Sequence, residues 1–312
     1  MPGLTRARQV LPGTTYLFVR RCLERRRLLH FDRQSRQIWR FCLALALERH
    51  GLQVHAFCVL QDQHLLVISD PLGRLSAFAQ ELHANLARAL NRMRRRCQSL
   101  WAPGSFSATP RVGAEAVLEA MVQVMTAPVE EGLVEQRLLW PGVCSQPEDL
   151  GWRFEARRPF HFFSDPLLQA VKWGRHPSQV PEVVPYTLSR PPQLAHLSTA
   201  ELRARLRERV DGAVTRIRER RRQQGLGYVG AWALRRVDPD TSAPGLTLRE
   251  IRRDPWKARE QRRASREFWR RHREARLAFQ AGDREVLFPA GTWAAVRVYG
   301  ARVEPPPDST AA

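Results

Sequence analysis

Two short apolar runs separated by a polar break constrain the fold of this chain more than any other feature. The runs span 57–60 and 64–69, and each is too short to be a helix of ordinary length. Gln61-Asp62-Gln63 stands between them, and His64 opens the second run. Apolar runs of this length on either side of a polar break predict two neighbouring β-strands joined by a turn.

The polar break contains a candidate half of a metal site. Side chains alternate between the two faces of a strand, so Asp62 and His64 point the same way if the second strand begins at Asp62. A carboxylate and an imidazole side by side are ligands for a divalent ion such as Mg²⁺ or Mn²⁺. The alternative is a polar turn with an incidental histidine, because turn segments are normally rich in polar residues.

Helix and strand signals surround this strand pair in a regular order. Residues 14–19 are a β-branched and aromatic run that predicts a strand. An apolar stripe with helical spacing follows, with Asp32 as its N-cap and Gly51 as its stop signal. After a turn at 70–73, a second helical stripe extends over 75–93. The strand pair therefore lies between two predicted helices.

The same order continues to residue 127. A broken strand signal spans 100–107, and a third helix is expected over 113–127, where Pro128 should end it. Strands and helices in this order predict an α+β fold. We expect a ferredoxin-like antiparallel sheet with helices on one face.

The second half of the chain has a different composition. Residues 141–192 are rich in Pro, Trp, Phe and Arg without a clear period, which is typical of a linker or wrapping segment. Ser198 and Glu201 form a capping box for a helix that ends before Gly225, and a long basic helix follows Pro255. These shifts predict an α+β domain over 1–140, a linker over 141–197, a helical basic domain over 198–302 and a disordered tail over 303–312.

Positive charge is the dominant global property of the chain. The formal net charge is +20 and the pI is near 11.3, which favours polyanions such as nucleic acid as partners. For any single arginine, a solvated helix face is the simpler reading. Clusters at the ends of elements are the better candidates for phosphate contacts, with Trp101 or Trp140 stacking on bases. The DNA-binding candidates are Arg20, Arg21, Arg25, Arg26, Arg27, Arg88, Arg92, Arg94, Arg95, Arg96 and Trp101.

Cysteine usage and hydropathy bound the cellular context. The five cysteines show no C-x-x-C spacing, so neither a disulfide framework nor a zinc cluster is indicated. No apolar run approaches the length of a membrane span, and the N-terminus lacks the apolar core of a signal peptide. We expect a reduced, cytoplasmic, nucleoid-associated protein.

The first domain resembles the single-tyrosine HUH transposases, most closely the REP-associated tyrosine transposases. The order and spacing of several segments over about residues 14–134 carry the likeness: the entry strand with its arginines, 54–60 leading to 64–67, 86–92 followed by Leu100-Trp101, and 128–134. In that family two histidines flanking one hydrophobic residue hold a divalent metal. A tyrosine on a helix then attacks the scissile phosphate and becomes linked to its 5′ end.

This sequence departs from the family pattern at each catalytic part. Only His64 of the histidine pair remains, with Asp62 in place of its partner. Counting back from Pro128, the resemblance places the nucleophile position at Gln123 and the last metal-ligand position at Ala127. An amide side chain cannot form the covalent linkage, so we expect no strand transfer from this position.

Three hypotheses remain open. The one we favour is a transposase-derived protein that binds hairpin or single-stranded DNA and has lost strand transfer. The second is an active nicking and transposing enzyme in which Asp62 and His64 hold the metal and a distant tyrosine, Tyr186 or Tyr228, attacks. The third is an Arg-rich RNA-binding protein that shares only the sheet. Family relatives occur as monomers and dimers, so a homodimer is allowed.

Overall fold

The structure is a computed structural model that describes residues 9–162, 180–242 and 255–306. The chain divides into two compact units. We call residues 15–69 with 77–248 the sheet unit, and residues 1–14, 70–76 and 249–312 the second unit. Across the described residues, no helix combines the length and the apolar character that crossing a bilayer requires.

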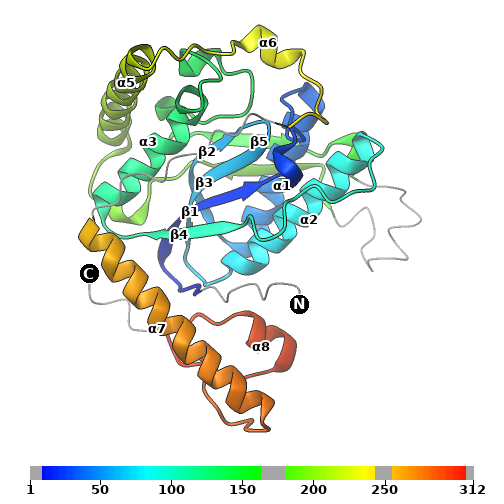
Figure 1. Cartoon of the computed structure of the whole chain (residues 1–312), viewed down its shortest axis with the longest axis vertical. Helices are drawn as coiled ribbons and strands as arrows, with labels where there is room; N and C mark the ends of the chain where they lie inside the picture. The colour runs from blue at the N-terminus through cyan, green and yellow to red at the C-terminus, as the bar shows by residue number, and fades with distance from the viewer. Residues whose placement is uncertain (1–8, 163–179, 243–254, 307–312) are drawn as a thin grey trace. The chain divides into compact units, whose positions relative to one another are not determined.

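A four-stranded antiparallel sheet forms the centre of the sheet unit (Figure 1). Its strands are β1 (Thr14–Arg21), β2 (Gln53–Val59), β3 (Gln63–Asp70) and β4 (Ser107–Arg111), in the spatial order β2-β3-β1-β4. The predicted fold class is confirmed. The fourth strand lies further along the chain than its sequence signal, because Trp101 forms only an isolated bridge with Cys22.

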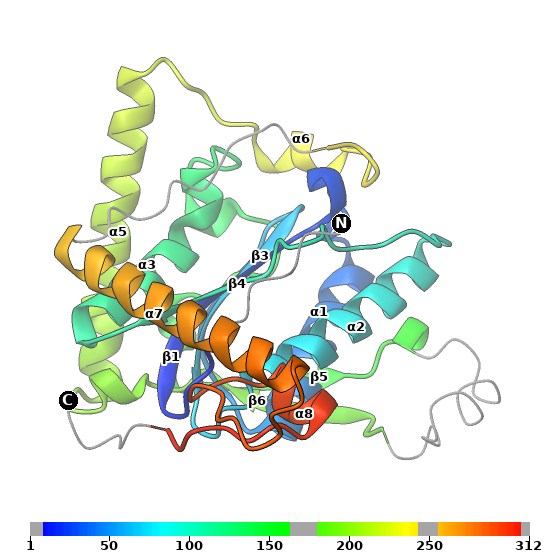
Figure 2. The ribbon, with the colours of Figure 1, turned by 60° about the horizontal axis from the view of Figure 1, so that its bottom comes forward.

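Helices cover both faces of this sheet (Figure 2). On one face, Phe18 of β1 packs edge-on against Phe78 of α2 (Leu75–Met93), and α1 (Arg33–His50) lies beside α2. On the other face, Leu65 and Val67 share a core with α3 (Ala114–Glu130) and α5 (Thr199–Gln223). The expected helices on one face are present, and the opposite face is buried as well.

The first helix forms as its sequence signals predict. The Asp32 carboxylate accepts a hydrogen bond from the Ser35 amide at 2.8 Å, which satisfies a donor of the first turn. Gly51 ends the helix with a left-handed φ of 70°, and its amide donates to the Leu47 carbonyl. These two residues fix where the helix begins and ends.

The third helix does not end at Pro128, so that expectation was wrong. Helix α3 continues to Glu130, with Pro128 inside it. Proline lacks an amide, which leaves the Val124 carbonyl without its usual helical donor, and the Cys144 thiol lies 4.0 Å from that oxygen. Pro128 and Val129 are buried, so packing of the last turn outweighs the local proline penalty.

Within the predicted linker, residues 143–145 pair with one edge of the sheet, and a separate hairpin follows. The Val59 amide donates to the Val143 carbonyl at 2.7 Å, and the Ser145 amide donates to the Phe57 carbonyl at 2.8 Å. Further along, β5 (Arg153–Arg157) pairs antiparallel with β6 (Val183–Thr187). The opposite edge strand, β4, contains Pro110. One edge strand of the sheet is therefore partly paired, and the other contains a residue without an amide hydrogen.

The second unit has a small core of its own. It contains α7 (Pro255–Gln280) and α8 (Ala294–Tyr299), and its buried residues Ala275, Phe288 and Ala301 pack together. Phe288 bridges to Val303, which orders the chain that follows α8. Of the predicted disordered tail, residues 307–312 lie outside the described residues.

The contact between the end of α3 and the end of α5 gives a stability prediction. Gly132 has a φ of +69°, and a Cβ there would lie 2.1 Å from a guanidinium nitrogen of the buried Arg221. Gly104 has a φ of +66° with nothing within 4 Å of the same position. Replacing either glycine by alanine therefore incurs a similar cost for the left-handed backbone. Only the replacement at Gly132 also incurs a steric clash.

We expect Gly104→Ala to lower the free energy of unfolding by roughly 1 kcal/mol, from the left-handed backbone alone. Gly132→Ala should cost roughly 2–4 kcal/mol, because displacing Arg221 adds an overpacking term. Urea denaturation followed by far-UV circular dichroism measures both values. Equal losses in the two variants would show that Arg221 moves aside freely.

Candidate nucleic-acid interface

His64 lies inside an aromatic cluster between the sheet and helices α1 and α2. Its Nδ1 accepts a hydrogen bond from Trp39 Nε1 at 3.1 Å, which leaves the ring proton on Nε2, 3.1 Å from His83 Nε2. The ring stacks on Trp101 with a centroid separation of 5.3 Å. Burial, with a smaller contribution from Arg20, lowers the pKa of His64 to about 3. A neutral histidine with both nitrogens engaged is a core residue.

Asp62 lies outside strand β3, in the turn that precedes it. Its carboxylate accepts a hydrogen bond from Arg25 Nε at 2.8 Å, and its backbone carbonyl accepts from the Cys22 amide. Arg25 adopts a φ of 54°, a left-handed conformation that is unusual for a residue other than glycine. This strained backbone points Arg25 at the carboxylate, so the charge of Asp62 is balanced within the protein.

The predicted pairing of Asp62 with His64 does not fit a metal. Lone pairs on both residues are needed for coordination, but His64 uses both ring nitrogens within the core and Asp62 pairs with Arg25. Within the described ranges, no group of three or more His, Cys, Asp and Glu side chains is placed to hold a metal ion. We therefore derive no step through Mg²⁺ or Mn²⁺.

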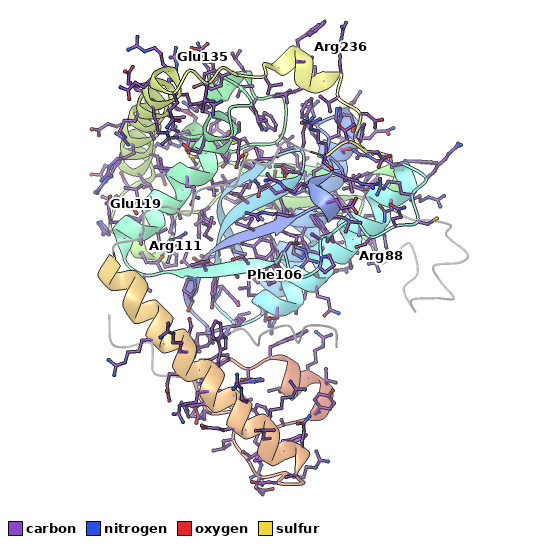
Figure 3. The ribbon with its side chains drawn as sticks, in the orientation of Figure 1. Arg88, Phe106, Arg111, Glu119, Glu135 and Arg236 are labelled. Atoms are coloured by element: carbon purple, nitrogen blue, oxygen red, sulfur yellow. The ribbon has the colours of Figure 1, made fainter. Side chains whose placement is uncertain are left out.

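Gln123 and His64 lie on opposite sides of the sheet. Gln123 is half-buried on α3, four residues after the exposed Glu119 (Figure 3). His64 faces Trp39 of α1 and His83 of α2. Of the two distant tyrosines, Tyr186 is buried and stacked on Phe154 in the β5–β6 hairpin, and burial raises its pKa to about 12. These contacts join neither Tyr186 nor Gln123 to His64.

Gln63, between the two predicted metal ligands Asp62 and His64, lies on the α3 face of the sheet. Because Gln63 alternates with His64, it shares a face with Leu65 and Val67, and Arg21 Nε lies 3.4 Å from its Oε1. Gln63 Nε2 is buried and has no hydrogen-bond acceptor among the described residues. Burial, and then the Asp62 carboxylate, raise the pKa of nearby Glu131 to about 7. Around Gln63, the positive charges of Arg21 and Arg25 therefore lie near the carboxyl groups of Asp62 and Glu131.

Many of the predicted DNA-binding arginines have acidic partners in the protein. Asp240 pairs with both Arg26 and Arg96, which belong to the two separate sequence clusters. Arg94 lies 3.7 Å from Asp32. Of the remaining candidates, Arg27 donates to Thr241, Arg88 to Asn85, and Arg20 lies over the Trp101 ring. Arg92 and Arg95 are exposed at the end of α2 and have no ion-pair partner in the part of the chain that the structure describes.

Two adjoining surface hollows lie at the N-terminal end of α1. The larger, of about 520 Å³, lies between α1, the end of α2 and residues 238–240, and the smaller is about 250 Å³. They share Asp32 and Arg33. We call them together the arginine groove, after their basic lining residues Arg33, Arg36, Arg94, Arg235 and His30. The larger hollow is also lined by three carboxylates, Asp32, Asp238 and Asp240, so the basic residues without a nearby carboxylate belong mainly to the smaller hollow. The groove joins the cluster at the end of α2 to α6 (Ala231–Arg235).

The aromatic residues chosen from the sequence are not at this surface. Trp101 and Trp140 are both 7% exposed, so the expectation that they are exposed was wrong. Trp101 Nε1 donates to the His83 carbonyl, and Trp140 packs edge-on against Phe31. Neither ring is open to a base in this conformation. Sequence reasoning missed Trp232, which is 67% exposed on α6.

Other groove residues were also missed. Arg33 and Arg36 are exposed and lie three residues apart on α1, so they share one helix face. Arg235 lies on α6, in a stretch that has no helical period in the sequence. The spacing of Arg33 and Arg36 was available as a signal. The position of Arg235 near Arg33 and Arg36 could not be predicted from the sequence, because it depends on packing between residues far apart in the chain.

Comparisons with known proteins show a distant likeness among solved structures. No protein-family model matches the chain, and no curated protein matches it. Among solved structures, the chain is similar to a REP-associated tyrosine transposase bound to a REP hairpin, with a TM-score of 0.40 and 18% identity. The similarity covers 46% of this chain and 82% of that chain. A likeness this distant assigns no function to this protein.

The interior position of His64 predicts a structural role. We expect His64→Ala to lower the free energy of unfolding by about 3 kcal/mol, because it opens a cavity and leaves Trp39 Nε1 without an acceptor. His196→Ala, at an exposed position, is the matched control and should change stability little. We also expect the Tm of the wild type to be the same with EDTA and with Mn²⁺. A rise in Tm with Mn²⁺ that His64→Ala abolishes would contradict this assignment.

Glu131 gives a prediction about pH. The folded protein holds its proton more tightly than the unfolded chain, whose glutamate pKa is near 4.5. Stability in the wild type should therefore fall as the pH rises through the window from 4.5 to about 7. Glu131→Gln removes this loss, because an amide does not titrate.

We expect the stability of Glu131→Gln relative to wild type to improve by roughly 2–3 kcal/mol between about pH 5 and about pH 8. Urea denaturation at both pH values gives the difference. Glu135→Gln, at an exposed position on the same connection, is the control and should show no such change. A pH-independent difference for Glu131→Gln would mean that Glu131 titrates normally.

Proposed function

We propose that this protein binds single-stranded or hairpin DNA through the arginine groove and does not carry out tyrosine strand transfer. The groove carries the proposal, since it gathers Arg33, Arg36 and Arg235 on one open surface beside the exposed Arg92 and Arg95. Arginine is well suited to phosphate because its planar fork binds two oxygens at once. A strand lying in the groove would place successive phosphates against these side chains.

Two observations support binding without strand transfer. Gln123 stands where the resembled family has its nucleophile, and His64 is buried on the other face of the sheet. A reaction of that family requires a phenol and a metal on one side of the scissile phosphate. The choice of DNA over RNA rests on the sequence resemblance, and the groove itself supports nucleic acid.

The test is affinity against salt for a hairpin-forming single strand. We expect Arg33→Ala with Arg36→Ala to weaken binding and to reduce the slope of log K against log salt by about 1.4, since each single-strand phosphate contact contributes about 0.7. Arg216→Ala with Arg222→Ala removes the same charge from exposed positions on α5 and should leave the slope nearly unchanged. Fluorescence anisotropy measures both.

The same DNA, incubated with Mg²⁺ or Mn²⁺ and run on a denaturing gel, tests the absence of strand transfer. We expect no covalent protein–DNA adduct. A metal-dependent adduct lost in Tyr228→Phe or Tyr186→Phe would assign an active nicking enzyme. Equal affinity for an RNA hairpin, with no preference for DNA, would favour the RNA-binding alternative. An unchanged salt slope in the α1 variant would remove the groove from the interface.

A further inference from the structure

Trp232 is held at the surface by a short helix that is firmly anchored. Its neighbour Leu234 is 1% exposed and belongs to the same core as α3 and α5. Gln61 Nε2, in the turn between β2 and β3, donates to the Leu234 carbonyl at 3.2 Å. The Val229 and Gly230 amides donate to the carbonyls of Gly132 and Leu133, just after α3, at 3.0 and 2.9 Å. The exposed indole therefore sits on a rigid support.

The indole also carries a cation on its ring. The Arg236 guanidinium carbon lies 3.6 Å from the Trp232 ring centroid, and Arg236 lies beside α6 in Figure 3. Two-thirds of the Trp232 surface remains exposed, at 67%. An indole with a guanidinium on its ring is a positively charged aromatic surface, which suits the π-face of a nucleobase next to a phosphate. A purely apolar partner would gain nothing from the charge.

Trp232 is connected to the arginine groove through α6. Arg235 follows Trp232 by three residues and lines the smaller hollow together with Arg33 and Arg36. Phosphates on these arginines would therefore bring the bases of the same strand to the end of the groove where α6 lies. In a duplex the bases are stacked and paired, so only an unpaired base has a free face for the indole.

We propose that Trp232, with Arg236 on its ring, is a stacking platform for one unpaired base of a strand whose phosphates lie in the arginine groove. The proposal rests on the proposed function and adds the single-stranded character of the ligand. Stacking on an aromatic side chain tolerates any base, so the platform selects for unpaired bases rather than for sequence.

The experiment compares Trp232→Ala, Trp232→Phe and Trp152→Ala in the full chain. Trp152 is 58% exposed and lies outside the residues that line the groove, so it matches Trp232 in exposure. The probes are a short single-stranded DNA and a blunt duplex of the same sequence. We expect Trp232→Ala to weaken single-strand binding by about 5- to 100-fold and duplex binding by less than about twofold. Trp232→Phe should retain most of the wild-type affinity for the single strand, and Trp152→Ala should bind like the wild type.

Three outcomes would overturn the platform: unchanged binding in Trp232→Ala, an equal loss for single strand and duplex, or failure of phenylalanine to restore binding. If the wild type dimerises and Trp232→Ala abolishes the dimer while DNA binding is unchanged, the surface belongs to a second copy. If the groove variants lose affinity and Trp232→Ala does not, only the platform fails. If the wild type binds neither probe, the proposed function itself fails. Tm and circular dichroism of each variant confirm that it is folded.

Discussion

Strand alternation at the start of β3 determines which face of the sheet His64 occupies. The strand begins at Gln63, so His64 turns towards Trp39 and His83, and Gln63 turns towards the side covered by α3. A register shift of one residue would exchange these two side chains between the faces. The histidine that the sequence offers as a metal ligand is therefore part of the packing between the sheet and two helices.

Several arginines that the sequence offers as DNA contacts likewise form contacts within the protein. The net charge of +20 suggests a uniformly basic surface, but several arginines are neutralised inside the sheet unit. Arg25 holds the turn at Asp62, and Arg94 lies beside the N-cap Asp32. Asp240 links two clusters that are about seventy residues apart in the sequence, at Arg26 and Arg96. Among the arginines that remain on open surface are Arg33, Arg36 and Arg235 of the groove and Arg92 and Arg95 at the end of α2.

Local signals predicted the elements well, and they predicted the site poorly. Asp32 and Gly51 mark the first helix because capping depends only on neighbouring residues. Pro128 misled because burial of the last turn of α3 comes from distant packing. Trp101 has nothing in its local sequence to show that it stacks on His64, so its burial was not predictable. The groove was missed for the same reason, since Arg235 meets Arg33 and Arg36 only through the tertiary fold.

The two borders of the central sheet have a consequence for how copies of this protein meet. Along β2, the Val59 amide is already paired with the Val143 carbonyl, and the Phe57 carbonyl with the Ser145 amide. Along β4, Pro110 has no amide hydrogen to donate, and proline in a sheet is typical of edge strands. The paired groups on β2 and the missing amide on β4 reduce what each border offers to a strand of another molecule, which disfavours growth into an extended intermolecular sheet.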